Sequence, residues 1–252
     1  MLGDKRKRRR VGWVITDQLD RGPWIRESWF TSGGVGLARY SWLSQHVNHH
    51  VEGWRYEQYR PWRRYDAVVF LKSMGDRAHK LMTRLQSKGV ACLFDCNVNY
   101  FDSEGTEYYA GMLPTPSQGV EVQRMVRSAT AVIADSEFIA EQCGKHNPRT
   151  TWIPDAVDIT AARYSSWTHR GKRLRLLWSG QAVKLFELLA AEDVLLSLKD
   201  HLELVLVTND LSAMDRLYPD IRKQLEGLLA QLSVTIVPYV SIDQLFSVYA
   251  NG

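Results

Sequence analysis

No apolar run in this sequence approaches the ~18–20 residues that a membrane-spanning helix requires. The basic N-terminus is not followed by the apolar segment of a secretory signal peptide. The three cysteines have neither zinc-ligand spacing nor the even number of a disulfide framework, which favours reduced thiols in a cytosolic protein. A Walker loop, a serine nucleophile elbow and a paired-cysteine zinc site are also missing. A reduced globular protein is therefore the simplest interpretation.

Positive charge is concentrated at the N-terminus. Six of the first ten residues are Lys or Arg and one is Asp, whereas the whole chain carries a net charge of only +4. We therefore interpret residues 1–10 as a basic tail on a nearly neutral protein. Residues 5–10 could contact anionic lipid at the inner face of the membrane, or they could be a solvated, disordered tail. The expected localisation is cytoplasmic. Specific nucleic-acid binding is not expected, because the tryptophans form no stacking platform.

Strand-length apolar runs alternate with helix-length amphipathic segments through the first half of the chain. Residues 66–71 have the apolar character of a buried parallel strand. Apolar side chains from Ala78 to Leu85 fall on one face of a helix that Gly89 terminates. The pattern predicts strands at 11–16, 66–71, 90–95, 131–134 and 150–154, helices at 37–47, 76–88, 119–128 and 137–144, a long loop at 96–118, and nothing definite at 51–60.

The alternation is interrupted at residues 159–173, which are polar and basic, and then restarts. Such alternation implies parallel sheets with right-handed crossovers. We therefore predict an α/β protein with two Rossmann-like, doubly wound domains, at residues 11–158 and 174–252, joined by a linker at 159–173. The second domain holds only about three strand–helix units, so it is expected to be incomplete. Its expected strands are 174–178, 202–207 and 234–237, and its expected helices are 183–198, 214–231 and 242–249.

Polar residues follow several of these strands, where ligands bind in open parallel sheets. Asp95, Asn97 and Asn99 end the strand at 90–95, and together they could bind a polyhydroxylated ligand. Asp95 could act as a base or as an orienting group. The alternative is a cluster that only caps and turns the chain. Asp135 and Ser136 follow the strand at 131–134, where helix capping alone could also explain them.

Two glycine-containing segments could approach phosphate groups. Gly33, Gly34 and Gly36 precede a helix, although their spacing differs from the dinucleotide fingerprint and a plain turn is equally compatible. Gly180 follows the first strand of the second domain, and Lys184 lies four residues later at the start of a helix. Taken alone, a lysine such as Lys184 is more often a solvated helix residue. His46 and His50 could form a metal pair on one helix face, but no other ligand is suitably spaced, so no metal site is expected.

The order of these motifs resembles the GT-B glycosyltransferases, in particular the family 4 type that makes surface polysaccharides. Three stretches carry the resemblance: residues 33–36 with 38–40, residues 129–138 running on to 152–158, and residues 177–180 with Lys184. Asp155-Ala156 stands where the family more often has asparagine-glycine, and no glycine follows Lys184. The family's paired glutamates, which hold the donor, would lie beyond residue 252.

This resemblance implies transfer of a hexose from a nucleotide-sugar donor to a sugar or lipid-linked acceptor, in polysaccharide or glycoconjugate synthesis. It implies retention of stereochemistry, no tightly bound cofactor and no metal. Asp95 and Lys184 are the candidate catalytic residues. We expect the 252-residue chain to be a truncated enzyme, inactive alone. Two other functions fit the pattern, namely a non-catalytic two-lobed nucleotide-sugar binder and a GT-B-like sugar-nucleotide epimerase.

Overall fold

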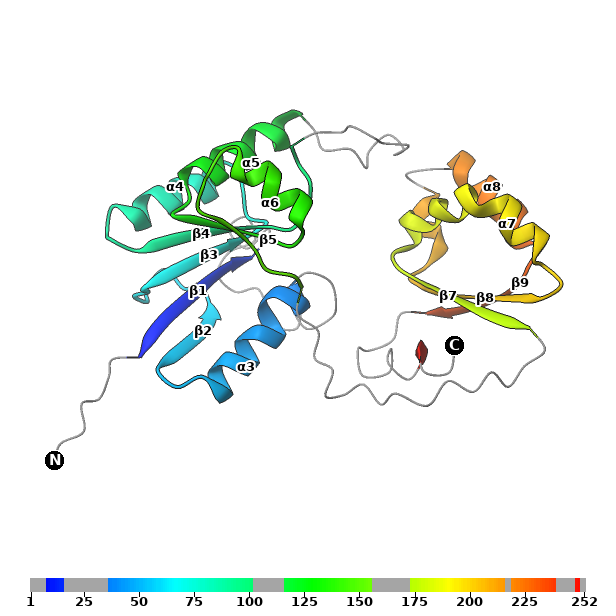
Figure 1. Ribbon diagram of the computed structural model, residues 1–252, viewed down its shortest axis with the longest axis horizontal. Coiled ribbons are helices and arrows are strands. Elements are labelled where there is room, and N and C mark those ends of the chain that lie inside the picture. The colour runs from blue at the N-terminus through cyan, green and yellow to red at the C-terminus, as the bar shows by residue number, and fades with distance from the viewer. Residues whose placement is uncertain are drawn as a thin grey trace. The chain divides into compact units, whose positions relative to one another are not determined.

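The computed structural model describes residues 8–15, 36–101, 116–155, 173–215, 219–238 and 248–249. The chain divides into two compact units, Met1–Val157 and Asp158–Gly252 (Figure 1). Each contains one parallel sheet, which confirms the predicted α/β class with two Rossmann-like domains. None of the helices described combines the length and the apolar character that crossing a bilayer requires.

The sheet of unit 1 has six parallel strands in the order β2-β1-β3-β4-β5-β6. The chain runs outward from β1 to β2 on one side and then to β3 on the other, which creates a topological switch point between β1 and β3. The strands are β1 (Arg9–Ile15), β2 (Trp54–Gln58), β3 (Ala67–Leu71), β4 (Ala91–Cys96), β5 (Ala131–Ala134) and β6 (Thr150–Trp152).

Side chains alternate between the two faces of this sheet and are buried in two separate clusters. One face, which includes Val14, Phe70 and Phe94, packs with α4 (Asp76–Gln86), α5 (Pro116–Ser128) and α6 (Glu137–Gly144) (Figure 1). The opposite face includes Val11, Trp13 and Val69 and packs with Tyr40 of η1 (Gly36–Ser41). Helix α3 (Trp42–His50) continues η1 on this second face.

Strand β2 was not predicted, because Trp54–Gln58 alternates aromatic with charged or amide side chains rather than forming an apolar run. The position of β2 is fixed by its pairing with β1 and by side-chain contacts with residues outside the strand. Asn48 of α3 exchanges two 2.8 Å hydrogen bonds with the backbone of Tyr56. The Arg9 guanidinium lies 5.3 Å from the centre of the Trp54 ring. An edge strand held by such contacts leaves little signal in local sequence.

The remaining differences in unit 1 concern boundaries. Strand β1 begins at Arg9 rather than Val11, and the Arg10 backbone N–H donates to Asp66 Oδ2 at 2.7 Å. These two basic residues therefore belong to the sheet and not to a free tail. Helix α5 begins at Pro116, three residues before the predicted start, as suits a residue without an N–H in the first helical turn.

Unit 2 contains a three-stranded parallel sheet, ordered β7 (Leu174–Ser179), β8 (Leu202–Thr208) and β9 (Ser233–Pro238). Figure 1 shows α7 (Glu192–Ser197) and α8 (Pro219–Leu229) on one side of this sheet. The helix expected at 183–198 consists of a 3₁₀ segment, η2 (Ala182–Ala191), followed by α7. The helix expected at 214–231 corresponds to α8, which begins at Pro219 and ends at Leu229; the 3₁₀ segment η3 (Leu211–Met214) precedes it.

Candidate functional site

Acidic and amide side chains gather at the carboxyl edge of the sheet in unit 1. Asp95 lies near the end of β4 and Asn97 follows it, Asp135 follows β5, and Asp155 follows β6. Because the strands are parallel and adjacent, their carboxyl ends meet at one edge of the sheet. Asp95 and Asp155 both lie within ion-pair distance of the Arg39 guanidinium, and the charge of Asp135 raises the pKa of both.

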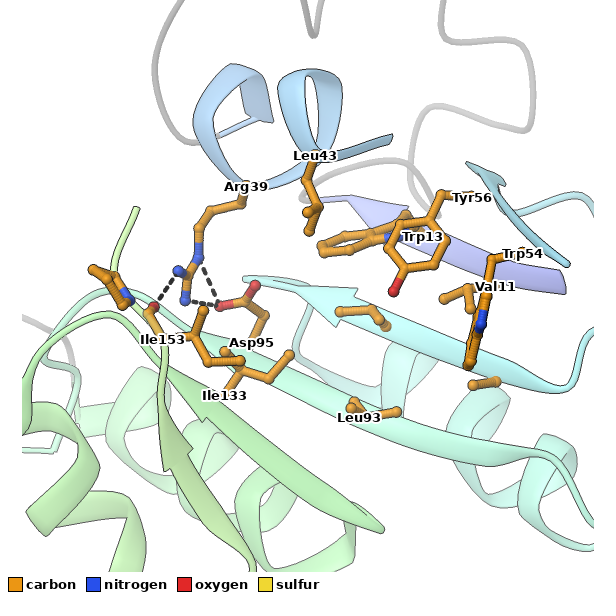
Figure 2. Close-up of a pocket in the computed structure, with 13 residues that line it drawn as sticks. Val11, Trp13, Arg39, Leu43, Trp54, Tyr56, Leu93, Asp95, Ile133 and Ile153 are labelled. Carbon is orange, nitrogen blue, oxygen red and sulfur yellow. Dashed lines mark hydrogen bonds and ion pairs between the residues drawn. The ribbon is translucent and has the colours of Figure 1, made fainter. Parts of the chain in front are cut away.

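Arg39 of η1 is the cation that holds this edge together. Its Nε and Nη2 atoms donate to Asp95 Oδ1 at 3.2 and 2.9 Å, and Nη1 donates to the carbonyl oxygen of Ile153 (Figure 2). Its Nε also lies 3.3 Å from Asp155 Oδ1. Arg39 is 4% exposed and Asp95 is 1% exposed. The guanidinium therefore links the ends of β4 and β6 in a buried ion pair.

The buried position of Asp95 changes its acidity. Desolvation raises its pKa from 3.8 to about 6, the Arg39 guanidinium opposes this rise, and the neighbouring Asp155 and Asp135 add to it. Burial and Asp135 also raise the pKa of Asp155. One guanidinium thus pairs with two of these carboxyl groups, Asp95 and Asp155. Asp95 is ionised at neutral pH but titrates close to it, as suits a group that exchanges a proton or a strong hydrogen bond with a ligand.

Several polar atoms at this edge have no partner. Both Asn97 Oδ1 and Nδ2 are buried without a hydrogen bond, and Asn97 is only 7% exposed. Asp135 Oδ1 is buried and unpartnered in the same way. A buried polar atom without a partner costs about 1–3 kcal/mol, so such atoms are rare in folded proteins and commonly belong to a site that a ligand completes. Asn97 and Asp135 together offer two acceptors and one donor to a hydroxylated ligand.

Two other predicted site residues have local structural roles. Asn99 Oδ1 accepts a hydrogen bond of 3.1 Å from the Phe101 N–H, which closes a turn after β4. Ser136 is the N-cap of α6, and its hydroxyl oxygen accepts from the Ile139 N–H at 3.3 Å. The capping interpretation of Ser136 is confirmed, whereas contact of either residue with a ligand stays a prediction.

A cavity of about 360 Å³ adjoins the carboxyl edge, between α3 and the sheet (Figure 2). Arg39 and Asp95 form its polar end. Figure 2 shows that Arg39 engages one carboxylate oxygen of Asp95 while the other faces the cavity. The remaining walls are apolar or aromatic and include Trp13, Leu43, Tyr56 and other side chains of the same sheet face.

Arg39 and Asp155 were not among the predicted site residues. Arg39 lies 56 residues from Asp95 in the sequence, and its pairing depends on the fold. The available signal was an arginine at the start of an otherwise apolar helical segment, Ala38-Arg39-Tyr40, because a buried arginine needs a buried counter-charge. Of the glycine cluster, Gly36 is the first residue of η1, three positions before Arg39, while Gly33 and Gly34 lie outside the described residues.

The predicted phosphate segment of unit 2, residues 180–184, lies between β7 and η2 and includes the start of η2, and local contacts account for its glycine. The Gly180 N–H donates to the Val207 carbonyl oxygen at 3.1 Å, and the Ala182 N–H donates to Asn209 Oδ1 at 2.7 Å. A Cβ atom at Gly180 would lie 2.8 Å from Cη2 of Trp178, so indole packing alone favours glycine here. Lys184 is exposed, and no side chain in the described part of unit 2 pairs with its ammonium group.

Two histidines of α3 and three cysteines of unit 1 are the described side chains that bear on metal binding. His46 and His50 lie on one face of α3, with ring centres 4.9 Å apart. Among the residues that the structure describes, no group of three or more His, Cys, Asp or Glu side chains could hold a metal ion. Cys92, Cys96 and Cys143 are all buried and free.

Solved structures with the same architecture include two relatives of this fold. A glycosyltransferase from Rickettsia africae ESF-5 matches with a TM-score of 0.51 and 13% identity, over 97% of this chain and 71% of that one. Anabaena HepE, solved in complex with UDP and glucose, matches with a TM-score of 0.50 and 14% identity, over 81% of this chain and 61% of HepE. At these identities the likeness establishes the fold alone. No protein-family model and no curated protein matches the sequence.

Proposed function

We propose that the protein transfers a sugar from a nucleotide-sugar donor to a hydroxyl group of an acceptor. The observation that carries this proposal is the buried polar edge of unit 1, where Asn97 and Asp135 have unpartnered atoms beside the Arg39–Asp95 ion pair. Such a constellation suits a ligand rich in hydroxyl groups. The fold supports the same function, because HepE has this fold and binds UDP and glucose.

In this proposal unit 1 binds the acceptor. Asp95 is held through one oxygen by Arg39 and accepts a hydrogen bond from the attacking hydroxyl through the other. Asn97 and Asp135 bind neighbouring hydroxyl groups. Gly33, Gly34 and Gly36 contribute backbone N–H groups near the same ligand, and Asn99 and Ser136 border it.

Unit 2 binds the donor in this proposal. Lys184 provides its ammonium group to the diphosphate, and Gly180 keeps the preceding turn compact. The leaving diphosphate is stabilised by this charge without a metal ion. Lys184 is exposed and forms no ion pair with a described residue, so its ammonium group can reach a ligand.

The finer assignment rests on the sequence motifs. We propose a family 4-like enzyme that retains the anomeric configuration and acts in polysaccharide or glycoconjugate synthesis in the cytoplasm. The basic residues that precede β1, at positions 5–8, would bring it to anionic lipid. NMR of the glycosidic product tests the configuration, and a change of configuration would contradict this assignment.

The test of the proposed function is release of nucleoside diphosphate by the purified full-length protein with a panel of nucleotide sugars, UDP-glucose first. We expect release that depends on an acceptor and a product heavier by one sugar. Lys184→Ala should reduce turnover at least ~10-fold, as when one preorganised charge is removed. Lys223→Ala, an exposed lysine on α8, is the matched control and should leave turnover unchanged.

Two results would favour the other functions. Nucleotide-sugar binding without diphosphate release, whatever the acceptor, would indicate a non-catalytic binder. Conversion of one nucleotide sugar into another without acceptor would indicate an epimerase. Either result contradicts the proposal.

A further inference from the structure

The cavity under α3 runs along the strands and away from the carboxyl edge. Asp95 lies near the carboxyl end of β4, whereas Ala67 begins β3 and pairs with Ala91, four residues before Asp95. At about 3.3 Å per residue, these positions are roughly 13 Å apart along the sheet. Both Ala67 and Asp95 line the cavity. The cavity therefore extends from the polar edge to the opposite end of the strands.

The walls away from Asp95 suit an apolar occupant. Figure 2 shows Trp13, Tyr56 and Trp54 on one side of the cavity and Leu93 on the sheet below them. Cavities of a few hundred Å³ with mainly apolar and aromatic walls are typical small-molecule sites. The side chain of Leu43 covers the cavity from α3 and is partly exposed.

The charges at the polar end restrict the group that can bind there. Asp95 and Asp155 both contact the Arg39 guanidinium, and the charge of Asp135 also acts on Asp95, so among the described residues the carboxyl groups at this end outnumber the guanidinium. An anionic headgroup would be repelled. A neutral headgroup with several hydroxyls would instead donate to Asp95, which lines the cavity, and, beyond the cavity lining, to Asp135 Oδ1 and Asn97 Oδ1, which are buried without partners among the described residues.

We propose that the cavity binds the apolar aglycone of a neutral glycoside, whose sugar hydroxyls occupy the carboxyl edge beside Asp95 and Asn97. The statement that this ligand is the acceptor rests on the proposed function. Binding of the glycoside to the cavity does not depend on that function. The apolar part of this ligand lies along the sheet face under α3, and its sugar lies at the carboxyl edge, next to Asp95.

Calorimetric titration without nucleotide sugar tests the inference. The probes are octyl β-glucoside below its critical micelle concentration, methyl β-glucoside and octanoate. We expect octyl glucoside to bind at least tenfold more tightly than methyl glucoside, because only the octyl chain fills the cavity. Octanoate should bind at least tenfold more weakly than octyl glucoside, because its carboxylate meets the acidic edge.

Variants locate the binding site. Ala67→Leu adds side-chain volume to the cavity and should weaken octyl glucoside binding at least tenfold. Leu43→Gln places an amide over the cavity from a partly exposed position and should also weaken octyl glucoside binding. This second variant keeps the test possible if Ala67→Leu fails to fold. Val51→Gln is the matched control, because Val51 follows α3, is similarly exposed and does not line the cavity.

Equal affinities for octyl and methyl glucoside, or no effect of either cavity variant in a folded protein, would overturn the inference. Tight octanoate binding would also overturn it. If octyl glucoside fails to bind while acceptor-dependent diphosphate release persists, only this inference falls. If octyl glucoside binds as expected while no donor releases diphosphate, only the proposed function falls.

Discussion

Replacement of Arg39 by methionine is expected to lower the free energy of unfolding of unit 1 by about 3–5 kcal/mol at pH 7. The change leaves the buried Asp95 carboxylate near Asp135 and Asp155 without its counter-charge, and the Ile153 carbonyl oxygen loses a donor. Thermal unfolding measures the effect, and a loss of this size corresponds to roughly 6–20 °C in Tm for a unit of this length.

The matched control is Arg124→Met. Arg124 pairs with Asp76 at 2.8 Å, but this carboxylate is largely exposed, so the loss should be about 1 kcal/mol or less. The charge-dependent part of the penalty in Arg39→Met should also disappear as pH falls below about 6, because the Asp95 carboxyl group is then neutral in both proteins. A loss as small as that of Arg124→Met at pH 7 would show that the ion pair does not hold the ends of β4 and β6 together.

Replacement of Asp95 by asparagine is expected to reduce turnover by about 10²-fold or more, the usual effect of removing a group that handles a proton or developing charge. Turnover of the unmodified protein should rise as pH increases through about 6, because ionised Asp95 accepts the hydroxyl hydrogen. The variant should lack this rise. Rate measurements from pH 5 to 8 at saturating donor test both statements, and an unchanged pH profile in the variant would contradict them.

The raised pKa of Asp95 also makes the free energy of unfolding depend on pH. The pKa of Asp95 is higher in the folded protein than its ordinary 3.8, so the folded state binds this proton more tightly than the unfolded chain. The contribution of Asp95 to stability is therefore full below pH ~3.8 and is lost as pH rises through about 6. Asp95→Asn should remove this pH-dependent part.

The central strands of unit 1 were predictable because their apolar character is local. Strands β3, β4 and β5 are short runs of apolar residues with helices between them, and Asp76–Gln86 shows helical spacing without any tertiary information. Strand β2 was not predictable in this way, because its own residues form no apolar run. Its stabilising contacts come from residues outside the strand, namely β1, which includes Arg9, and Asn48 of α3.

The features of the candidate site also differ in whether local sequence predicts them. Asp95, Asn97 and Asp135 were predicted because each follows a strand in a parallel sheet, and that rule needs only the order of the elements. The pairing of Arg39 with Asp95 and the cavity under α3 depend on how the elements pack. Neither spacing nor composition specifies which arginine meets which carboxylate, or where packing leaves a space.

The position of the acceptor site is tested most directly by Asp135→Asn. Asp135 Oδ1 has no partner in the described structure, so the substitution should leave unfolding unchanged while it removes the carboxylate charge and replaces one of the two acceptor oxygens with an NH2 donor. Asp76→Asn, at an exposed carboxylate of α4, is the matched control. In paired calorimetric titrations, we predict that Asp135→Asn weakens octyl glucoside binding at least ~10-fold, the effect of one strong hydrogen bond, and leaves UDP binding unaltered. Unchanged glucoside affinity, or a loss of UDP binding instead, would contradict the assignment of the acceptor to the carboxyl edge of unit 1.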